Sequence, residues 1–317
     1  MRTGRFHNWG IILPKWHRKG SVIASMKTII SADRTCDLTE ELYAQYGIET
    51  VPYHIILGGK QYRDNVDITI EEVFEHFEKH GELPTTSAVN VGEYIEHFNR
   101  LRDEAGEPCE IVHITLGSAL TASYKNCCAA AEELGGIYVV DSCTLSSASG
   151  LQAIDASEMA AEGKTAQEIC NYLNSHIQCY HASFVVDTME YLKAGGRCSS
   201  VTAFAASALN IKPSIVVDGF KNGAMTTSKI YRGKFTKAFA RYVRDEIAKY
   251  DDIDWSRCMI TGSSALVDKE SPEIAIDILK SETQFENYYI TQASCTIGSH
   301  CGPRTWGILF KTHSNGL

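Results

Sequence analysis

Residues 83–89 read LPTTSAV and residues 115–124 read TLGSALTASY, and these two stretches are the basis for predicting the fold. In each stretch, apolar residues lead into small hydroxyl residues, and a segment with helically spaced apolar residues follows. The pattern predicts hydroxyls at helix N-termini, where unpaired backbone N–H groups can hold an anion. Together the clusters are expected to hold one carboxylate. The alternative is that Thr85, Ser87 and Ser118 only cap their own helices.

Strands and helices alternate around these clusters. Strands are predicted at 27–33, 110–115 and 136–141. Helices are predicted at 70–79, 91–103 and 121–134, and a further helix from about 150 to about 161. Such alternation is typical of a parallel βαβ sheet, whose ligands lie beyond the carboxyl ends of the strands. We expect both hydroxyl clusters at that edge. Residues 50–57 are predicted to form one strand, which continues over 60–64 after the turn at Gly58-Gly59.

The second half repeats the mixture of elements. Strands are predicted at 183–187, 210–219, 228–231, 257–261, 288–292 and 306–310, with helices at 166–176, 188–193 and 272–280. The predicted fold class is therefore α/β with two domains. The N-terminal domain has a mainly parallel βαβ sheet with helices on both faces, and the smaller C-terminal domain is also α/β. The expected boundaries are a disordered extension at 1–25 and domains at 26–163 and 164–317.

Composition excludes several classes of protein. The chain has 317 residues, of which 44% are hydrophobic and 22% charged, so it is long enough for a large core. A net charge of −9 without a basic block argues against nucleic acid as the main partner. No apolar run reaches the length of a transmembrane helix. Eleven cysteines without a CxxC pair fit neither a disulfide framework nor a zinc site, which indicates a reducing cytoplasm.

Motifs for catalysis are weak. Ser118 follows a strand, and His113 and His300 are available, but the nucleophile-elbow pattern GxSxG is absent. The sequence also lacks a phosphate-binding loop and an HExxH metal motif. Arg197 follows Gly195-Gly196, where it is either an anion partner or an exposed residue after a helix end. These observations favour binding of a small anionic molecule with an apolar body, without catalytic residues, metal or cofactor. The alternative is an acyl- or phosphoryl-group hydrolase or transferase that uses Ser118.

Eight segments together resemble the DegV family, which is related to the fatty-acid-binding subunit of bacterial fatty acid kinase. The matching segments are 33–38 (DRTCDL), 62–68 (YRDNVDI), 84–87 (PTTS), 116–124 (LGSALTASY), 140–142 (VDS), 191–197 (YLKAGGR), 209–213 (LNIKP) and 300–303 (HCGP). The resemblance runs from about residue 26 to the C-terminus. Five positions depart from the family pattern, namely Arg34 for serine, Gly117 for serine, Ala119 and Ala122 for glycines, and Arg304 for a glycine.

The resemblance implies a carrier and not an enzyme. The acyl chain of a long-chain fatty acid would be buried, and its carboxylate would be held by Thr85, Thr86 or Ser87 and by Ser118. Arg197 and His300 would give nearby polar or charged support. The bound acid would be presented to a separate ATP-binding kinase subunit, which forms an acyl phosphate for phospholipid synthesis. Neither the chain length of the acid nor the presence of a kinase partner follows from the sequence.

Overall fold

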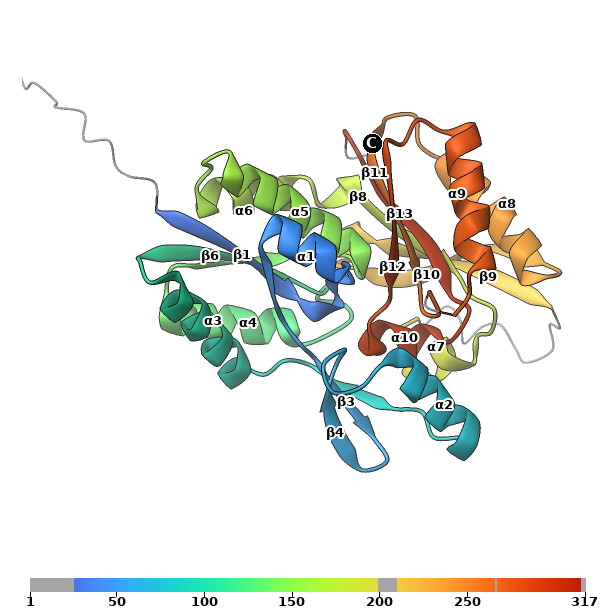
Figure 1. The fold of residues 1–317 in the computed structure, drawn as a ribbon, viewed down its shortest axis with the longest axis horizontal. Helices are drawn as coiled ribbons and strands as arrows, with labels where there is room; N and C mark the ends of the chain where they lie inside the picture. Colours follow the sequence, from blue (N-terminus) through green and yellow to red (C-terminus); the bar gives the residue numbers. More distant parts are fainter. Residues whose placement is uncertain (1–25, 199–209, 266, 315–317) are drawn as a thin grey trace, which may run out of the picture.

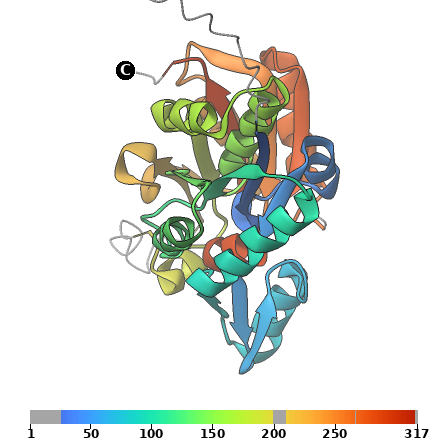
Figure 2. The ribbon, with the colours of Figure 1, turned by 90° about the vertical axis from the view of Figure 1, so that its left-hand side faces the viewer.

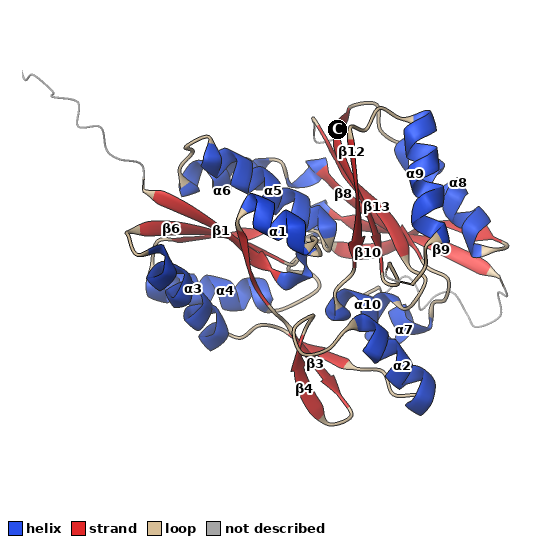
Figure 3. Cartoon of the chain, in the orientation of Figure 1, coloured by secondary structure: helices blue, strands red, loops and turns tan. Residues whose placement is uncertain are grey.

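The computed structural model describes residues 26–198, 210–265 and 267–314. The predicted extension at 1–25 lies outside the described residues. In the described part of the chain the strands form sheets of four, six and three strands. Figure 3 shows the two larger sheets side by side, with helices packed around them.

The four-stranded sheet has the order β2-β1-β6-β7, and every neighbouring pair is parallel. Its strands are β1 Lys27–Asp33, β2 Ile48–Val51, β6 Cys109–Thr115 and β7 Ile137–Asp141. Helices α3 and α4 cover one face, and α5 and α6 cover the other (Figure 1). The helices of this half are α1 Glu40–Tyr46, α3 Val91–Ala105, α4 Ser123–Leu134, α5 Ser147–Ala161 and α6 Ala166–Ser175. The predicted parallel βαβ sheet with helices on both faces is confirmed.

The six-stranded sheet has the order β10-β9-β8-β13-β11-β12, in which only β11 and β12 are parallel neighbours. Its strands are β8 Tyr180–Val185, β9 Ile211–Asp218, β10 Ala224–Arg232, β11 Ile253–Gly262, β12 Asn287–Gln292 and β13 Trp306–Thr312. Helix α8 Phe235–Ile247 packs against this sheet and against α9 Glu270–Glu282. Sequence analysis did not predict α8.

Helix α5 joins the two sheets into one structure. It contacts β1 and β6 of the four-stranded sheet and β8, β11 and β13 of the six-stranded sheet. A helix packed on both sides needs small or apolar residues all round, and α5 buries nine residues that include Ala148, Gly150 and Ala153. One hydrophobic cluster therefore extends through both halves. The domain boundary at residue 163 stays a prediction.

The three-stranded antiparallel sheet and α2 project from the rest of the molecule (Figures 1 and 2). This unit comprises β3 His54–Leu57, β4 Lys60–Arg63, α2 Ile70–His80 and β5 Thr85–Ser87. The prediction of one strand at 50–57 was wrong, because the chain leaves the parallel sheet after β2 and enters this sheet at β3. Pro52 separates the two strands, since it lacks the N–H that a continuous strand would need.

Short elements complete the fold. Helices α7 Glu190–Gly195 and α10 Cys295–Cys301 pack against each other, and α10 also contacts α2. The structure adds short 3-10 helices at η1 Arg34–Cys36, η2 Ile177–Cys179 and η4 Gly219–Lys221. Helix α10 was not predicted from the sequence.

Candidate functional site

A cavity of about 220 Å³ lies where the two halves meet. The first half contributes the β5 segment, Tyr53 and the loop that follows β6, and the second half contributes α10, Arg197 and Met225. The apolar residues that line it are Ala88, Leu116, Leu120, Ala122, Leu145, Met225, Ile297 and Cys301. The polar ones are Tyr53, Thr86, Thr121, Arg197, Thr296 and His300. The cavity is therefore apolar over most of its wall and has a few polar side chains, as expected for an amphipathic ligand.

Thr86 and His300 form a side-chain contact between the halves at this cavity. A hydrogen bond of 2.9 Å joins Thr86 Oγ1 to His300 Nε2, although the residues are 214 positions apart. The Nδ1 atom of His300 is buried and, among the described residues, has no hydrogen-bond partner. Burial, together with the nearby Arg197 charge, lowers the pKa of His300 to about 4. His300 is therefore neutral at pH 7, and a bound carboxylate can gain a hydrogen bond from it.

Arg197 lines the cavity from its exposed end. Its side chain is accessible to solvent, and Nη1 donates a hydrogen bond of 2.8 Å to the Gly195 carbonyl. Helix α7 ends just before it, with Gly196 in the left-handed conformation. Arg197 is thus an exposed residue after a helix end that also borders the cavity, and its role as an anion partner stays a prediction.

Three predicted site residues are not among those that line the cavity: Thr85, Ser87 and Ser118. Thr85 and Ser87 are exposed because alternate residues of β5 face opposite sides, and Thr86 takes the cavity side. Ser118 is partly buried, and its backbone N–H donates to Asp141 Oδ1 at 3.0 Å. No hydrogen bond between Ser118 and His300 is found in the described part of the chain, so the geometry gives no support to a Ser–His nucleophile.

The prediction of a helix N-terminus was wrong for the first hydroxyl cluster, and the alternative that Thr85, Ser87 and Ser118 cap helices was also wrong. The first cluster forms β5, and Asn90 caps the following helix α3. The second cluster is a loop at the carboxyl end of β6, and α4 begins only at Ser123, after Ala122. The first cluster reaches the cavity through a strand, whereas the second leads into the N-terminus of α4, where the Ser123 N–H donates to Thr121 Oγ1 at 3.2 Å.

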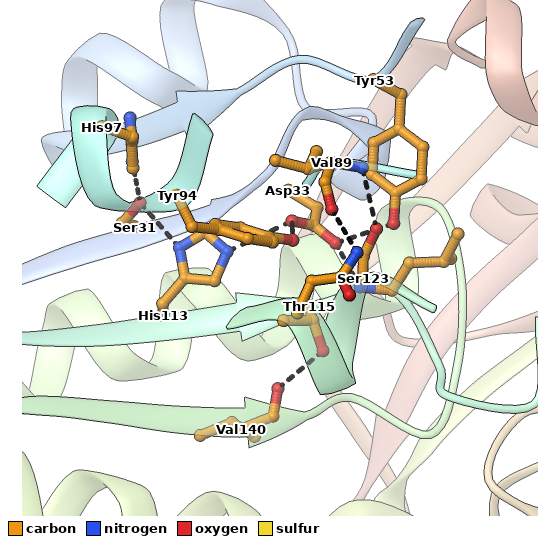
Figure 4. A network of polar contacts seen from close by, with 12 residues as sticks. Ser31, Asp33, Tyr53, Val89, Tyr94, His97, His113, Thr115, Ser123 and Val140 are labelled. Carbon is orange, nitrogen blue, oxygen red and sulfur yellow. Dashed lines mark hydrogen bonds and ion pairs between the residues drawn. The ribbon is translucent and has the colours of Figure 1, made fainter. Parts of the chain in front are cut away.

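A buried network beside the cavity was not predicted (Figure 4). Tyr53, which lines the cavity, donates a hydrogen bond of 3.0 Å to Asp33 Oδ2, and the N–H of Leu116 donates to the same oxygen at 2.8 Å. Asp33 Oδ1 accepts bonds from Tyr94, at 2.6 Å, and from His113, at 3.2 Å. Asp33 therefore holds Tyr53 and the loop after β6 in place. Asp33 lies at the end of a predicted strand, and this position could have identified it as a candidate from the sequence.

The described residues give no indication of a metal site or a membrane span. Within residues 26–198, 210–265 and 267–314, no group of three or more His, Cys, Asp or Glu residues is arranged to hold a metal ion. Over the same residues, no helix combines the length and the apolar content that crossing a membrane requires.

Comparison with known families identifies the chain. A family model described as "Uncharacterised protein, DegV family" matches residues 27–313. The chain belongs to the DegV family. A DegV domain-containing protein of Clostridium acetobutylicum is 30% identical over 285 residues, which cover 89% of this chain and 98% of that protein. One from Caldanaerobacter subterraneus subsp. tengcongensis is 29% identical over 290 residues, covering 90% of this chain and 99% of the relative.

Solved DegV structures share the fold. A DegV family protein from Thermus thermophilus, described as binding fatty acid, superposes with a TM-score of 0.81 at 25% identity and covers 90% of this chain and 100% of its own. DegV from Bacillus subtilis, described as a fatty acid binding protein, gives a TM-score of 0.74 at 26% identity, with 91% and 100% covered. The predicted family and the predicted fold class are thus both confirmed.

Proposed function

We propose that this protein binds a long-chain fatty acid, with the carboxylate at Thr86, Arg197 and His300 and the acyl chain along the apolar wall. The observation that carries the proposal is the hydrogen bond between Thr86 and His300 in a mostly apolar cavity between the halves. Arg197 is exposed and its charge acts on His300, so we place the open end of the cavity on this side. Two related DegV proteins are described as binding fatty acids, which supports the proposal.

The apolar part of the cavity lies next to a second, smaller cavity. Leu145, Ile297 and Cys301 line both the main cavity and a smaller one of about 30 Å³ that reaches the inner face of the six-stranded sheet. An acyl chain placed along these side chains would lose contact with water, and each buried CH₂ contributes about 0.8 kcal/mol. Because a buried carboxylate without partners costs several kcal/mol, the head group belongs at the polar, open end.

We infer that the protein acts as a carrier without catalysis of its own. A carboxylate at the open end is positioned for a second protein to reach it, and the family resemblance points to a fatty acid kinase subunit that forms an acyl phosphate for phospholipid synthesis. Such a carrier would act in the cytoplasm. That Thr85, Ser87 and Ser118 bind the carboxylate stays a prediction.

The test is mass spectrometry of the organic extract of the protein purified from a bacterial host, beside native mass spectrometry of the intact protein. We expect one fatty acid per chain, and the extract identifies its length and unsaturation. An empty protein that also takes up neither added oleate nor added palmitate would contradict the proposal. A parallel incubation with a fatty acid kinase ATP-binding subunit and ATP tests the carrier role, since acyl phosphate should form only when both proteins are present.

A further inference from the structure

Helix α10 brings several residues to the cavity, among them Ile297, His300 and Cys301. The first N–H groups of any helix have no partner within the helix. In α10 the Ile297 N–H donates to the Ser294 hydroxyl at 3.4 Å, which leaves the N–H groups of Ser294, Cys295 and Thr296. What these three groups bind decides where α10 lies.

Two carboxylates from the first half bind all three groups. The Ser294 N–H donates to Asp37 Oδ1 at 3.0 Å. The N–H groups of Cys295 and Thr296 donate to the two oxygens of Asp64, at 2.7 and 2.8 Å. Asp64 is 0% exposed and Asp37 3% exposed. The start of α10 is therefore attached to the other half of the molecule by charge-assisted bonds away from water.

Burial of these two carboxylates is unfavourable by itself. It raises the pKa of Asp64, and it raises the pKa of Asp37 to about 7, where the charge of Asp64 adds to the effect and hydrogen bonds from Ser146 and Ser294 oppose it. The N-terminal end of a helix offsets part of this cost through its N–H groups and its dipole. Movement of α10 would remove these N–H groups from both carboxylates, so the pairing favours one position of the helix.

Close packing fixes the rest of α10. A Cβ on Gly298 would lie 2.6 Å from the Ile70 side chain of α2, and a Cβ on Gly195 of α7 would lie 2.3 Å from His300 Nδ1. Both positions thus need glycine so that the helices can approach. With its N-terminus attached and its sides packed, α10 presents His300 to Thr86 in one orientation.

We infer that Asp37 and Asp64 are positioning residues for ligand binding: they hold the N-terminus of α10 and thereby place His300 beside Thr86. They belong to the segments DRTCDL and YRDNVDI, neither of which supplies a carboxylate partner in the proposed function. The inference rests on the proposed function for its role in binding, but the placement of His300 can be measured without a ligand.

The first experiment follows the His300 ring by NMR titration in the unliganded protein. In Asp64→Asn, one oxygen becomes an amide that cannot accept an N–H bond, so α10 should shift and His300 should become more exposed. We expect the pKa of His300, about 4 in the parent, to rise by about one unit or more toward 6.5. Asp67→Asn is the matched control, since Asp67 lies in the same segment but is exposed and paired with Arg63. An unchanged His300 titration in folded Asp64→Asn would overturn the inference.

The second experiment is a double-mutant cycle measured by oleate binding. Asp64→Asn should weaken binding about tenfold in the parent and by less than about twofold in a His300→Ala background. Equal losses in both backgrounds would show that Asp64 acts independently of His300 and would contradict the inference. If Asp64→Asn does not fold, Asp37→Asn and Ser294→Ala are taken through the same cycle. If the parent binds no oleate, the proposed function fails, and the NMR titration alone decides the placement of His300.

Discussion

Thr86 and Thr85 are adjacent residues of β5 that face opposite sides, and they make a matched pair for testing the head-group site. Thr86→Val keeps the shape and removes the hydroxyl that bonds His300. We expect oleate affinity to fall about tenfold, since a hydrogen bond to a charged group contributes about 1.5–3 kcal/mol. Thr85→Val should leave affinity unchanged because Thr85 is exposed and lies outside the cavity lining. Equal effects in the two variants, measured by titration calorimetry, would argue against Thr86 as a carboxylate partner.

Gly195 permits His300 to take its position. A Cβ at residue 195 would lie 2.3 Å from His300 Nδ1, so Gly195→Ala must displace the ring from Thr86. Alanine is also a better helix former than glycine, so stability should not fall through α7 itself. We expect weaker oleate binding, by about tenfold, and a loss of about 1–3 kcal/mol in the free energy of unfolding because the buried ring must move. Unchanged binding would show that the position of the His300 ring is unimportant for the ligand.

Gly117 stands where the family pattern has serine, and the structure explains the departure. A Cβ at residue 117 would lie 2.9 Å from the carbonyl oxygens of Asn222 and Thr144, both of which are main-chain atoms. Gly117→Ser should therefore destabilise the protein by about 1–3 kcal/mol and should not improve ligand binding. The neighbouring exposed Ala119 is the control, and Ala119→Ser should change stability by less than about 0.5 kcal/mol. Urea unfolding of both variants measures the difference.

At the scale of elements, Asp33 joins β1 to α3 and to the loop after β6. Its two oxygens accept hydrogen bonds from Tyr53, Tyr94, His113 and the Leu116 N–H. In Asp33→Asn, an NH₂ group replaces one of the two accepting oxygens and points at hydrogen-bond donors. We therefore expect a loss of about 3 kcal/mol in the free energy of unfolding. Tyr94→Phe removes one bond from the same carboxylate and should cost about 1 kcal/mol. Similar losses in the two variants would mean that the whole network contributes no more to the free energy of unfolding than the single Tyr94 hydrogen bond.

The elements also show which parts of the fold were predictable. The parallel strands and their helices can be predicted from local patterns. A buried strand or an amphipathic helix shows a characteristic spacing of apolar residues within its own sequence. Helix α8 has such a pattern, with buried residues at 235, 238, 239, 242 and 243, and sequence analysis overlooked it. Helix α10 has none, since its residues, CTIGSHC, are small or polar apart from Ile297 and its start depends on Asp37 and Asp64. Strand β5 likewise depends on pairing with β3.

At the scale of the whole molecule, the site belongs to both halves. Thr86 and His300 come together over 214 positions, and the packing of α10 against α2 and α7 contributes to their contact. Residue patterns identified Thr86, Arg197 and His300 as candidates because all lie in family segments. They did not distinguish these from Thr85, Ser87 and Ser118, because the face that each side chain takes depends on strand register and on the other half of the chain.

Buried ionisable groups make stability depend on pH in two opposite directions. Burial lowers the pKa of His97 to about 3 and that of His181 to about 4. Unfolded histidine titrates near 6.5, so the unfolded chain binds more protons below that pH. The stability that these neutral histidines contribute is complete above pH 6.5 and is lost as the pH falls toward 4. Asp37 acts oppositely, because its raised pKa of about 7 makes the folded protein bind the extra proton.

Two variants separate these contributions. His97→Gln removes a group that resists protonation in the folded state, so it should lose about 2 kcal/mol less than the parent between pH 7 and pH 5. Asp37→Asn removes a group that gains a proton on folding over this range, so its stability should fall more steeply with acid than that of the parent. Urea unfolding at the two pH values gives both differences. Parallel pH profiles for the parent and both variants would show that these groups titrate alike in the folded and unfolded chain, despite their burial.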